Sequence, residues 1–345
     1  MKNTEFSRKT RRQQKKHKKN LMLAISLVLL FIVISTSYIA TKIQLFNNTA
    51  DTITSDVGNR TNEEANHIIK NAKPINVLLL GIDNGAYGRG VENGRSDTML
   101  LLTLNPTQKK SQLLSIPRDT YTEIVGKNYY DKINHAYAFG QVKMAANTVE
   151  KLLDTEIDFY VEINMEGLMD FVNAVGGIEV TSPLTFTYEE RHFEEGKTEL
   201  LDGESALRFA RMRYDDPEGD YGRQKRQRIV IEALADKLMS VNAVTKYEDI
   251  MHAMSKNVKT DVPIKQALTL KNSYAPAFDD LTQIFITEHG FTLRNNMGEN
   301  IYYSYATDQE LLDKTNSIRV LMGKKPVQTY PLLQQRQDMS MYLVD

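Results

Sequence analysis

Two aspartates and two arginines stand at the ends of short apolar runs, where together they could bind a phosphorylated ligand. These residues are Asp83, Arg95, Asp97 and Arg118. The connections between the runs are short or rich in glycine, which predicts antiparallel neighbouring strands whose ends meet at one edge of a sheet. Open α/β sheets bind their ligands beyond strand ends, although surface salt bridges are the plain alternative for such residues.

A second basic cluster lies further along the chain. Arg211 and Arg213 are two residues apart, and in an extended segment they would project to the same side. Arg223 and Gln227 have the i, i+4 spacing of one helix face, and an apolar stripe continues that face. Guanidiniums at a helix start, above an apolar stripe, suit a ligand with an anionic head and an apolar tail. The other cations nearby are predicted to lie on solvated faces: Arg208, Lys225, Arg226 and Arg228.

Apolar patterning predicts the elements that position these residues. The runs predicted as strands are 75–82, 98–104, 112–116 and 157–163. The segments with helical spacing of apolar residues are 143–153, 165–175, 224–238 and 308–321. Asn164 and Thr307 are the expected N-caps of two of these helices. Strands interleaved with helices predict a layered α/β domain over residues 74–322.

The 345-residue chain has no cysteine, so disulfides, thiolate metal sites and cysteine nucleophiles are excluded. Its charge is asymmetric, because residues 1–20 carry nine Lys and Arg and one acid. The twenty residues from Leu21 to Ala40 have no charge, and as a helix they match the hydrocarbon thickness of a bilayer. The basic flank predicts that the N-terminus stays in the cytoplasm and that the chain after residue 41 lies outside.

The predicted organisation therefore has five parts. These are a cytoplasmic basic tail (1–20), a single-pass transmembrane helix (21–41), an extracytoplasmic stalk (42–73), the catalytic domain (74–322) and a C-terminal tail (323–345).

Seven ordered motifs resemble those of the LytR-CpsA-Psr family. They are NVLLLGID (76–83), RSDTM (95–99), SIPRD (115–119), KINHAY (132–137), VGGI (175–178), LDG with ALRFARMR (201–213) and DYGRQKRQ (220–227). Ordered motifs over this span are more specific than any single short pattern. The loop 84–94 is longer than expected for the family, which puts the position of Arg95 in question.

The resemblance implies an enzyme of the Gram-positive cell envelope. Such an enzyme transfers an anionic glycopolymer, a teichoic acid or capsular polysaccharide, from a polyprenyl-pyrophosphate carrier to peptidoglycan through a phosphodiester. It implies a three-layer α/β/α domain with a mixed central sheet and an apolar tunnel for the lipid. Asp83 and Asp97 would hold Mg²⁺ or Mn²⁺. The residues implied to bind the pyrophosphate are Arg95, Arg118, Lys132, Arg211, Arg213, Arg223 and Gln227. Of all these, the catalytic set is Asp83, Asp97, Arg118, Arg211 and Arg213.

Other functions stay open at this point. A hydrolase of lipid pyrophosphates would use the same residues with water as the nucleophile. A membrane-bound regulator or receptor of envelope synthesis would bind lipid-linked glycans without turnover. Nucleic-acid binding is not expected, because the arginine clusters are predicted to lie beyond the membrane and the basic tail has no element that reads bases.

Overall fold

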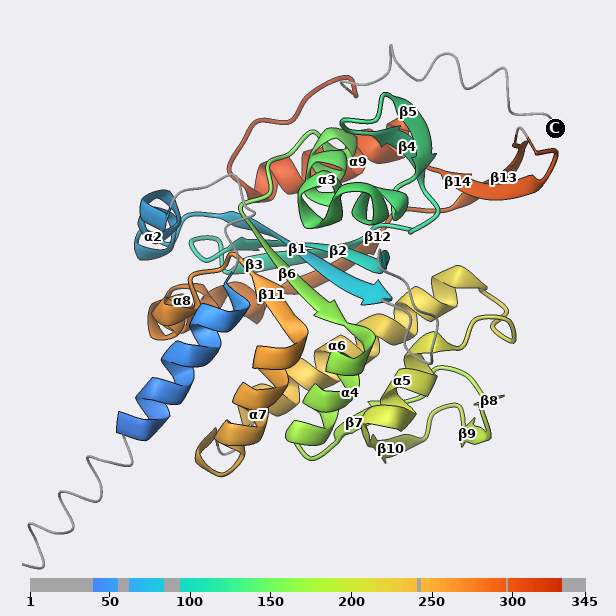
Figure 1. The fold of residues 1–345 in the computed structure, drawn as a ribbon. Helices are drawn as coiled ribbons and strands as arrows, with labels where there is room; N and C mark the ends of the chain where they lie inside the picture. Colours follow the sequence, from blue (N-terminus) through green and yellow to red (C-terminus); the bar gives the residue numbers. More distant parts are fainter. Residues whose placement is uncertain (1–39, 55–61, 84–93, 241–242, 296, 331–345) are drawn as a thin grey trace, which may run out of the picture. The chain divides into compact units, whose positions relative to one another are not determined.

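A six-stranded mixed sheet forms the centre of the fold (Figure 1). Its strands, in spatial order, are β11 (Val258–Thr260), β6 (Phe159–Asn164), β1 (Ile75–Asp83), β2 (Arg95–Asn105), β3 (Lys110–Ser115) and β12 (Leu281–Phe285). β2 is antiparallel to both β1 and β3, as the short connections predict. β6 and β12 are parallel to β1 and β3, respectively, and β11 is antiparallel to β6. The mixed central sheet is therefore confirmed.

The computed structural model describes residues 40–54, 62–83, 94–240, 243–295 and 297–330. The helices labelled in Figure 1 are α2 (Asn62–Lys70), α3 (His135–Leu153), α4 (Met165–Ala174), α5 (Gly203–Arg211), α6 (Asp220–Ser240), α7 (Ala243–Asn257), α8 (Ala267–Tyr274) and α9 (Asp308–Leu321). Four two-stranded ribbons complete the fold: β4–β5 (Tyr121–Ile124, Tyr129–Lys132), β7–β10 (Ile178–Thr181, Thr198–Leu201), β8–β9 (Phe186–Tyr188, Arg191–Phe193) and β13–β14 (His289–Arg294, Asn300–Tyr305).

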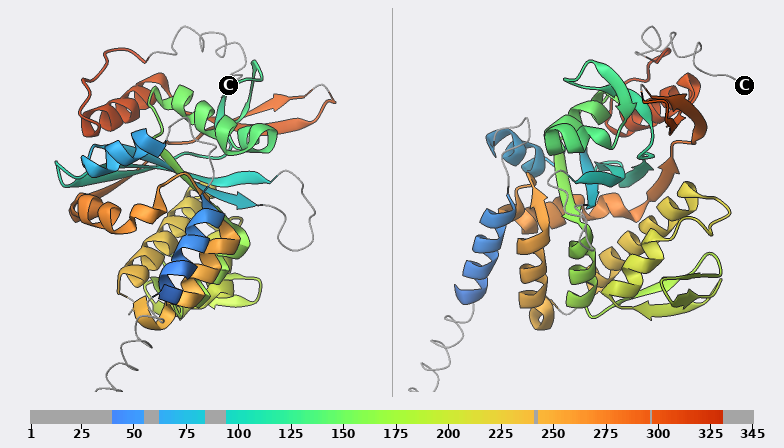
Figure 2. Two further views of the ribbon diagram at one scale, coloured as in Figure 1. Left: turned by 60° about the vertical axis from the view of Figure 1, so that its left-hand side comes forward. Right: turned by 45° about the vertical axis from the view of Figure 1, so that its right-hand side comes forward.

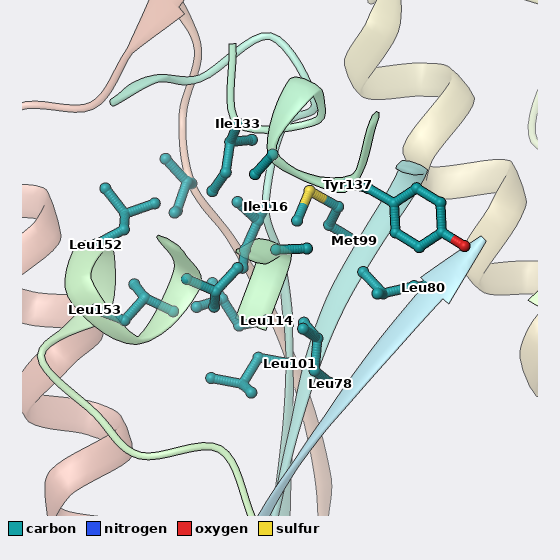
Figure 3. Close-up of a cluster of buried hydrophobic side chains, with 14 of the residues drawn as sticks. Leu78, Leu80, Met99, Leu101, Leu114, Ile116, Ile133, Tyr137, Leu152 and Leu153 are labelled. Atoms are coloured by element: carbon teal, nitrogen blue, oxygen red, sulfur yellow. The ribbon is translucent and has the colours of Figure 1, made fainter. Parts of the chain in front are cut away.

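Helices cover both faces of the central sheet (Figures 1 and 2). α3 and α9 lie on one face, where Leu78 and Leu80 of β1 enter a common core with Leu152 and Ile318 (Figure 3). α4, α6 and α7 lie on the other face. β1 is buried on both of its sides, and because side chains alternate across a strand, this explains its mostly apolar sequence.

Local sequence signals explain where several elements begin. The side chains of Asn164 and Thr307 accept hydrogen bonds from backbone N–H groups of the first turns of α4 and α9, so both predicted caps are confirmed. α3 begins earlier than expected, at His135, and its helical dihedral angles are interrupted at Gly140 and Gln141.

The packed unit extends beyond the predicted range 74–322. Ile69 of α2 is fully buried with Ile75 and Phe159, although α2 lies in the segment expected to be a stalk. Tyr330, in the expected tail, is 2% exposed in the core beneath α3, and its hydroxyl donates a hydrogen bond to the carbonyl of Leu152.

Within the described ranges, no helix has both the length and the apolar character needed to cross a membrane. The predicted anchor 21–41 falls outside the described residues except for its last two positions, and the basic tail 1–20 and the loop 84–93 also fall outside them.

Candidate functional site

A β-bulge places Asp97 at the end of the β1–β2 ladder. Gly81 pairs with Thr98 and Ile82 pairs with Ser96, so Asp97 is the extra residue of β2. Bulges bend a strand and re-aim side chains, and they are frequent beside active sites. The next pair in the ladder joins Asp83 of β1 and Arg95 of β2. The strand pairing therefore brings together Asp83, Arg95 and Asp97, three residues that the sequence singled out.

Asp97 is joined to the end of β3 by an ion pair. Its Oδ2 lies 3.0 Å from Nη1 of Arg118, and both side chains are about one-fifth exposed. Its Oδ1 accepts a 3.4 Å hydrogen bond from the amide of Asn134. Since solvent reaches both partners, the pair is open to a ligand from one side while protein contacts hold it on the other.

Asp119 links Arg118 to Lys132. Its Oδ1 accepts a 2.7 Å hydrogen bond from Nζ of Lys132, and its Oδ2 lies 3.6 Å from Nε of Arg118. Asp119 is 5% exposed, and the Lys132 ammonium lies 5.6 Å from the ring centroid of Tyr303. Lys132 therefore contacts the buried carboxylate of Asp119, and Asp119 in turn contacts Arg118.

The segment after Lys132 is tied to the segment after Arg118 by its backbone. The N–H of Ile133 donates to the carbonyl of Thr120, and the N–H of Asn134 donates to the carbonyl of Arg118. These bonds fix the amide of Asn134 over Asp97. No sequence signal other than the family motif marks Asn134, because its partner lies 37 residues away.

The second arginine cluster differs from its predicted conformation. The chain is helical through Arg211, the last residue of α5, so the expectation of an extended segment was wrong. Met212 then leaves the helix with φ −55° and ψ 136°, and it is fully buried. Arg211 and Arg213 flank this anchor and are half-buried, and the Arg213 guanidinium lies 6.0 Å from the ring of Tyr214, which is 92% exposed.

Arg226 of α6 holds the loop that carries these arginines. Its side chain is fully buried, which corrects the prediction of a solvated face. Its guanidinium donates to the carbonyls of Phe209 and Met212 and to the carboxylate of Asp216. Gly222 leaves space for this carboxylate, because a Cβ at that position would overlap it. A buried guanidinium with such partners is a positioning group, because all of its contacts are within the protein.

Arg228 is also buried, at 5% exposure, where a solvated face was expected. It donates a 2.8 Å hydrogen bond to Ser115 at the end of β3. Burial lowers the pKa of the Arg228 guanidinium. By contrast, Arg208 and Lys225 make partly exposed ion pairs with Glu204 and Glu218, as solvated residues do.

An apolar cavity of about 370 Å³ adjoins the arginine cluster. It lies between the sheet and helices α4, α6 and α7, and its apolar wall includes Leu79, Leu100, Val161, Leu168, Val230, Ile231 and Leu234. Arg211 and Gln227 also line it. Gln227 accepts a 2.9 Å hydrogen bond from Thr98, the residue after Asp97, which connects α6 to the bulged strand. Arg223, 6% exposed, lies one helical turn before Gln227 on the same face.

The donor set at the sheet edge suits a hard cation. No group of three or more His, Cys, Asp or Glu side chains gathers into a metal cluster in the described part of the chain. Asp83 and Asp97 nevertheless provide carboxylate oxygens on neighbouring strands, because Asp83 pairs with Arg95, two residues before Asp97. Mg²⁺ is bound by one or two carboxylates together with water and substrate phosphates, so two aspartates fit such an ion.

Comparisons with known proteins identify the family of the chain. The profile of the LytR_cpsA_psr family matches residues 40–319. A polyisoprenyl-teichoic acid–peptidoglycan teichoic acid transferase TagU of Enterococcus faecalis is 47% identical over 243 residues, which are 70% of this chain and 78% of that protein. The crystal structure of Bacillus subtilis TagU is 36% identical and has a TM-score of 0.57, covering 74% of this chain and 99% of that one. A structure of TagT bound to LIIa-WTA is 29% identical, with a TM-score of 0.59 and coverage of 78% and 96%.

Proposed function

Because the chain belongs to the LytR-CpsA-Psr family, we propose that it is a transferase that attaches an anionic glycopolymer to peptidoglycan. Relatives that are teichoic acid transferases support a polymer of the wall teichoic acid type. The donor carries this polymer on a polyprenyl pyrophosphate, and the product is a phosphodiester between polymer and peptidoglycan.

The observation that carries this proposal is the apolar cavity beside the arginines. A polyprenyl chain needs a long apolar space, and a pyrophosphate needs cations at the mouth of that space. The cavity has a largely apolar lining, and Arg211 and Gln227 are among its few polar residues. A soluble sugar nucleotide would have no use for such a space, so the geometry favours a lipid-linked donor.

Charge neutralisation is the main task of the protein in the reaction. A sugar hydroxyl of peptidoglycan attacks the phosphorus that bears the glycopolymer. The new O–P bond forms as the bridging P–O bond of the pyrophosphate breaks, polyprenyl phosphate leaves, and the hydroxyl proton passes to solvent. Arg118, Arg211 and Arg213 stabilise the negative oxygens of the pyrophosphate, and each such contact is worth about 3–4 kcal/mol in the barrier. Arg95 and Arg223 add positive charge, and Lys132 acts through Asp119 by keeping Arg118 in place.

Asp83 and Asp97 would hold Mg²⁺ or Mn²⁺ in this proposal. The ion supplies Lewis-acid stabilisation of the phosphoryl oxygens when it is bound. The ion pair with Arg118 orients the Asp97 carboxylate, and the Asn134 amide fixes its other oxygen.

The enzyme works at the outer surface of the cell membrane. The uncharged segment 21–41 anchors it and the basic residues 1–20 keep the N-terminus in the cytoplasm. The catalytic domain then meets both the lipid carrier in the membrane and peptidoglycan outside it.

A transfer assay tests the proposal. The full chain in mild detergent is mixed with a short polyprenyl-pyrophosphate glycan and peptidoglycan oligomers, with and without Mg²⁺. We expect a glycan–peptidoglycan conjugate that needs the metal and is lost in Arg118→Ala. The control Arg208→Ala removes a partly exposed arginine of α5 and should keep activity. Free glycan phosphate without conjugate would show a hydrolase, and binding without either product would show a receptor.

A further inference from the structure

Two exposed aromatic rings lie beside the candidate site. Tyr129 of β5 is 44% exposed and Phe139 of α3 is 40% exposed, and their ring centroids are 6.1 Å apart. The ring of His135 lies 6.0 Å from that of Phe139. The ammonium of Lys127 lies 5.3 Å from the Phe139 ring centroid. We call the surface formed by Lys127, Tyr129, His135 and Phe139 the aromatic face.

Backbone geometry sets the first turn of α3 apart from the rest of the helix. Gly140 and Gln141, directly after Phe139, have non-helical dihedral angles, and Gln141 has a φ of 52°. A side chain at Gly140 would overlap Met144. Strained positions of this kind concentrate at functional sites, where the surrounding structure holds them. Here the interruption follows the residue that presents its ring to solvent.

The aromatic face is continuous with the charged site. The Nδ1–H of His135 donates a 2.8 Å hydrogen bond to the carboxylate of Asp131, which fixes the His135 ring. The preceding residue, Asn134, donates to Asp97. Phe139 lies four residues after His135, about 6 Å along the helix axis. The consecutive residues Asn134 and His135 therefore link the Asp97–Arg118 pair to the aromatic face.

The geometry of the reaction predicts that the acceptor approaches from the side of the aromatic face. In phosphoryl transfer the attacking and leaving oxygens lie roughly in line. The cavity lies on the face of the sheet covered by α4, α6 and α7, so a lipid phosphate would leave toward that face. The attacking hydroxyl must then arrive from the opposite side, where α3 and the β4–β5 ribbon lie (Figures 1 and 2).

We propose that the aromatic face binds a sugar ring of the peptidoglycan acceptor and thereby delivers its hydroxyl to the site. This inference rests on the proposed transferase function. Aromatic rings pack against the apolar C–H faces of sugars, and Tyr129 and Phe139 offer such rings to solvent. Lys127 adds a positive charge that complements the carboxylates of the peptide stems on peptidoglycan. The occupant is therefore a glycan strand that carries acidic peptides.

The test compares steady-state kinetics of variants in the full-chain transfer assay, varying donor and acceptor separately. Phe139→Ala is expected to raise the acceptor KM about tenfold, which corresponds to about 1.4 kcal/mol of lost contact. The donor KM and the kcat should stay within about twofold. The matched control is Phe278→Ala, since Phe278 is 48% exposed in the 3-10 helix Ala275–Asp279 that follows α8. Phe139→Tyr keeps a ring and should retain the acceptor KM.

Direct binding separates this inference from the proposed function. Peptidoglycan oligomers, without donor, should bind the wild-type chain and bind Phe139→Ala about tenfold more weakly. If the wild type forms no conjugate, the transferase proposal fails whatever the variants do. If conjugate forms and neither Phe139→Ala nor Tyr129→Ala changes acceptor affinity, the aromatic face is overturned. A Tyr214→Ala variant that alone weakens the acceptor would also overturn it, by placing the acceptor beside the arginine loop. If Phe139→Ala does not fold, Tyr129→Ala decides.

Discussion

Replacing Arg226 by methionine removes the group that holds the arginine loop in place. The carboxylate of Asp216, 3% exposed at its side chain, would lose its ion pair, and the carbonyls of Phe209 and Met212 would lose donors. The N–H of Glu218 would be the remaining hydrogen-bond donor described for that carboxylate. Removing one partner of a buried ion pair costs about 3–5 kcal/mol of stability, so we expect Arg226→Met to lower the free energy of unfolding by that amount.

Urea unfolding of the full chain in mild detergent, followed by circular dichroism, measures this change. Arg208→Met is the matched control, because Arg208 makes a partly exposed i, i+4 pair with Glu204, worth about 0.3–0.5 kcal/mol. The double variant Arg226→Met with Asp216→Leu removes both charges. It should recover much of the lost stability, since no unpaired buried charge is left.

The same variants report on the site. Because Arg226 fixes the carbonyl of Met212, its loss should displace Arg211 and Arg213 and raise the donor KM. The reasoning is refuted if Arg226→Met costs no more than Arg208→Met, or if the double variant is as unstable as the sum of its single changes.

Three further changes test other parts of the structure. Ile231→Trp fills the apolar cavity and should abolish binding of polyprenyl phosphate, measured by thermal shift, while the ligand-free protein keeps its stability. Burial raises the pKa of Asp131, but the contacts with His135 and Lys132 outweigh burial and lower this pKa below its usual value of 3.8. The ionised Asp131 carboxylate therefore stabilises the fold above about pH 4, and this stabilisation is lost as the pH falls. Unfolding curves should therefore show that Asp131→Asn destabilises at pH 7 and that the difference disappears on acidification. Gly81→Ala places a methyl group 2.9 Å from Cβ of Thr98, and should cost about 1–3 kcal/mol in unfolding free energy and raise the donor KM.

Much of the central sheet is predictable because its signals are local. The apolar β1, its glycine-rich return to β2 and the turn from Asn105 to Lys110 predict the order of β1, β2 and β3 without any distant contact. The caps at Asn164 and Thr307 are equally local. Helix α5 has local signals of the same kind. Asp202 accepts from the N–H of Ser205 as an N-cap, and buried residues recur at helical spacing up to Ala210.

Other features depend on partners that the sequence does not identify. Arg226 is one of several basic residues in the segment 223–228, and only its carbonyl and carboxylate partners distinguish it as the fully buried one. Tyr330 is an isolated aromatic in a polar segment, and its partner is a carbonyl 178 residues away. The bulge at Asp97 is a property of strand pairing, because the sequence of β1 or β2 alone does not determine which residues of the two strands lie opposite each other.

With the role proposed for Asp97, the bulge at this residue separates folding from activity. The ladder between β1 and β2 skips this residue, so a chain from which Asp97 is deleted would pair these strands more regularly than the present one. The sheet, its core and its secondary-structure spectrum would survive such a deletion, whereas the anchor point for Arg118 and Asn134 would be gone. With the proposed function, natural variants that lose this one residue would accumulate as folded, membrane-anchored protein, and their defect would become visible only in the composition of the wall.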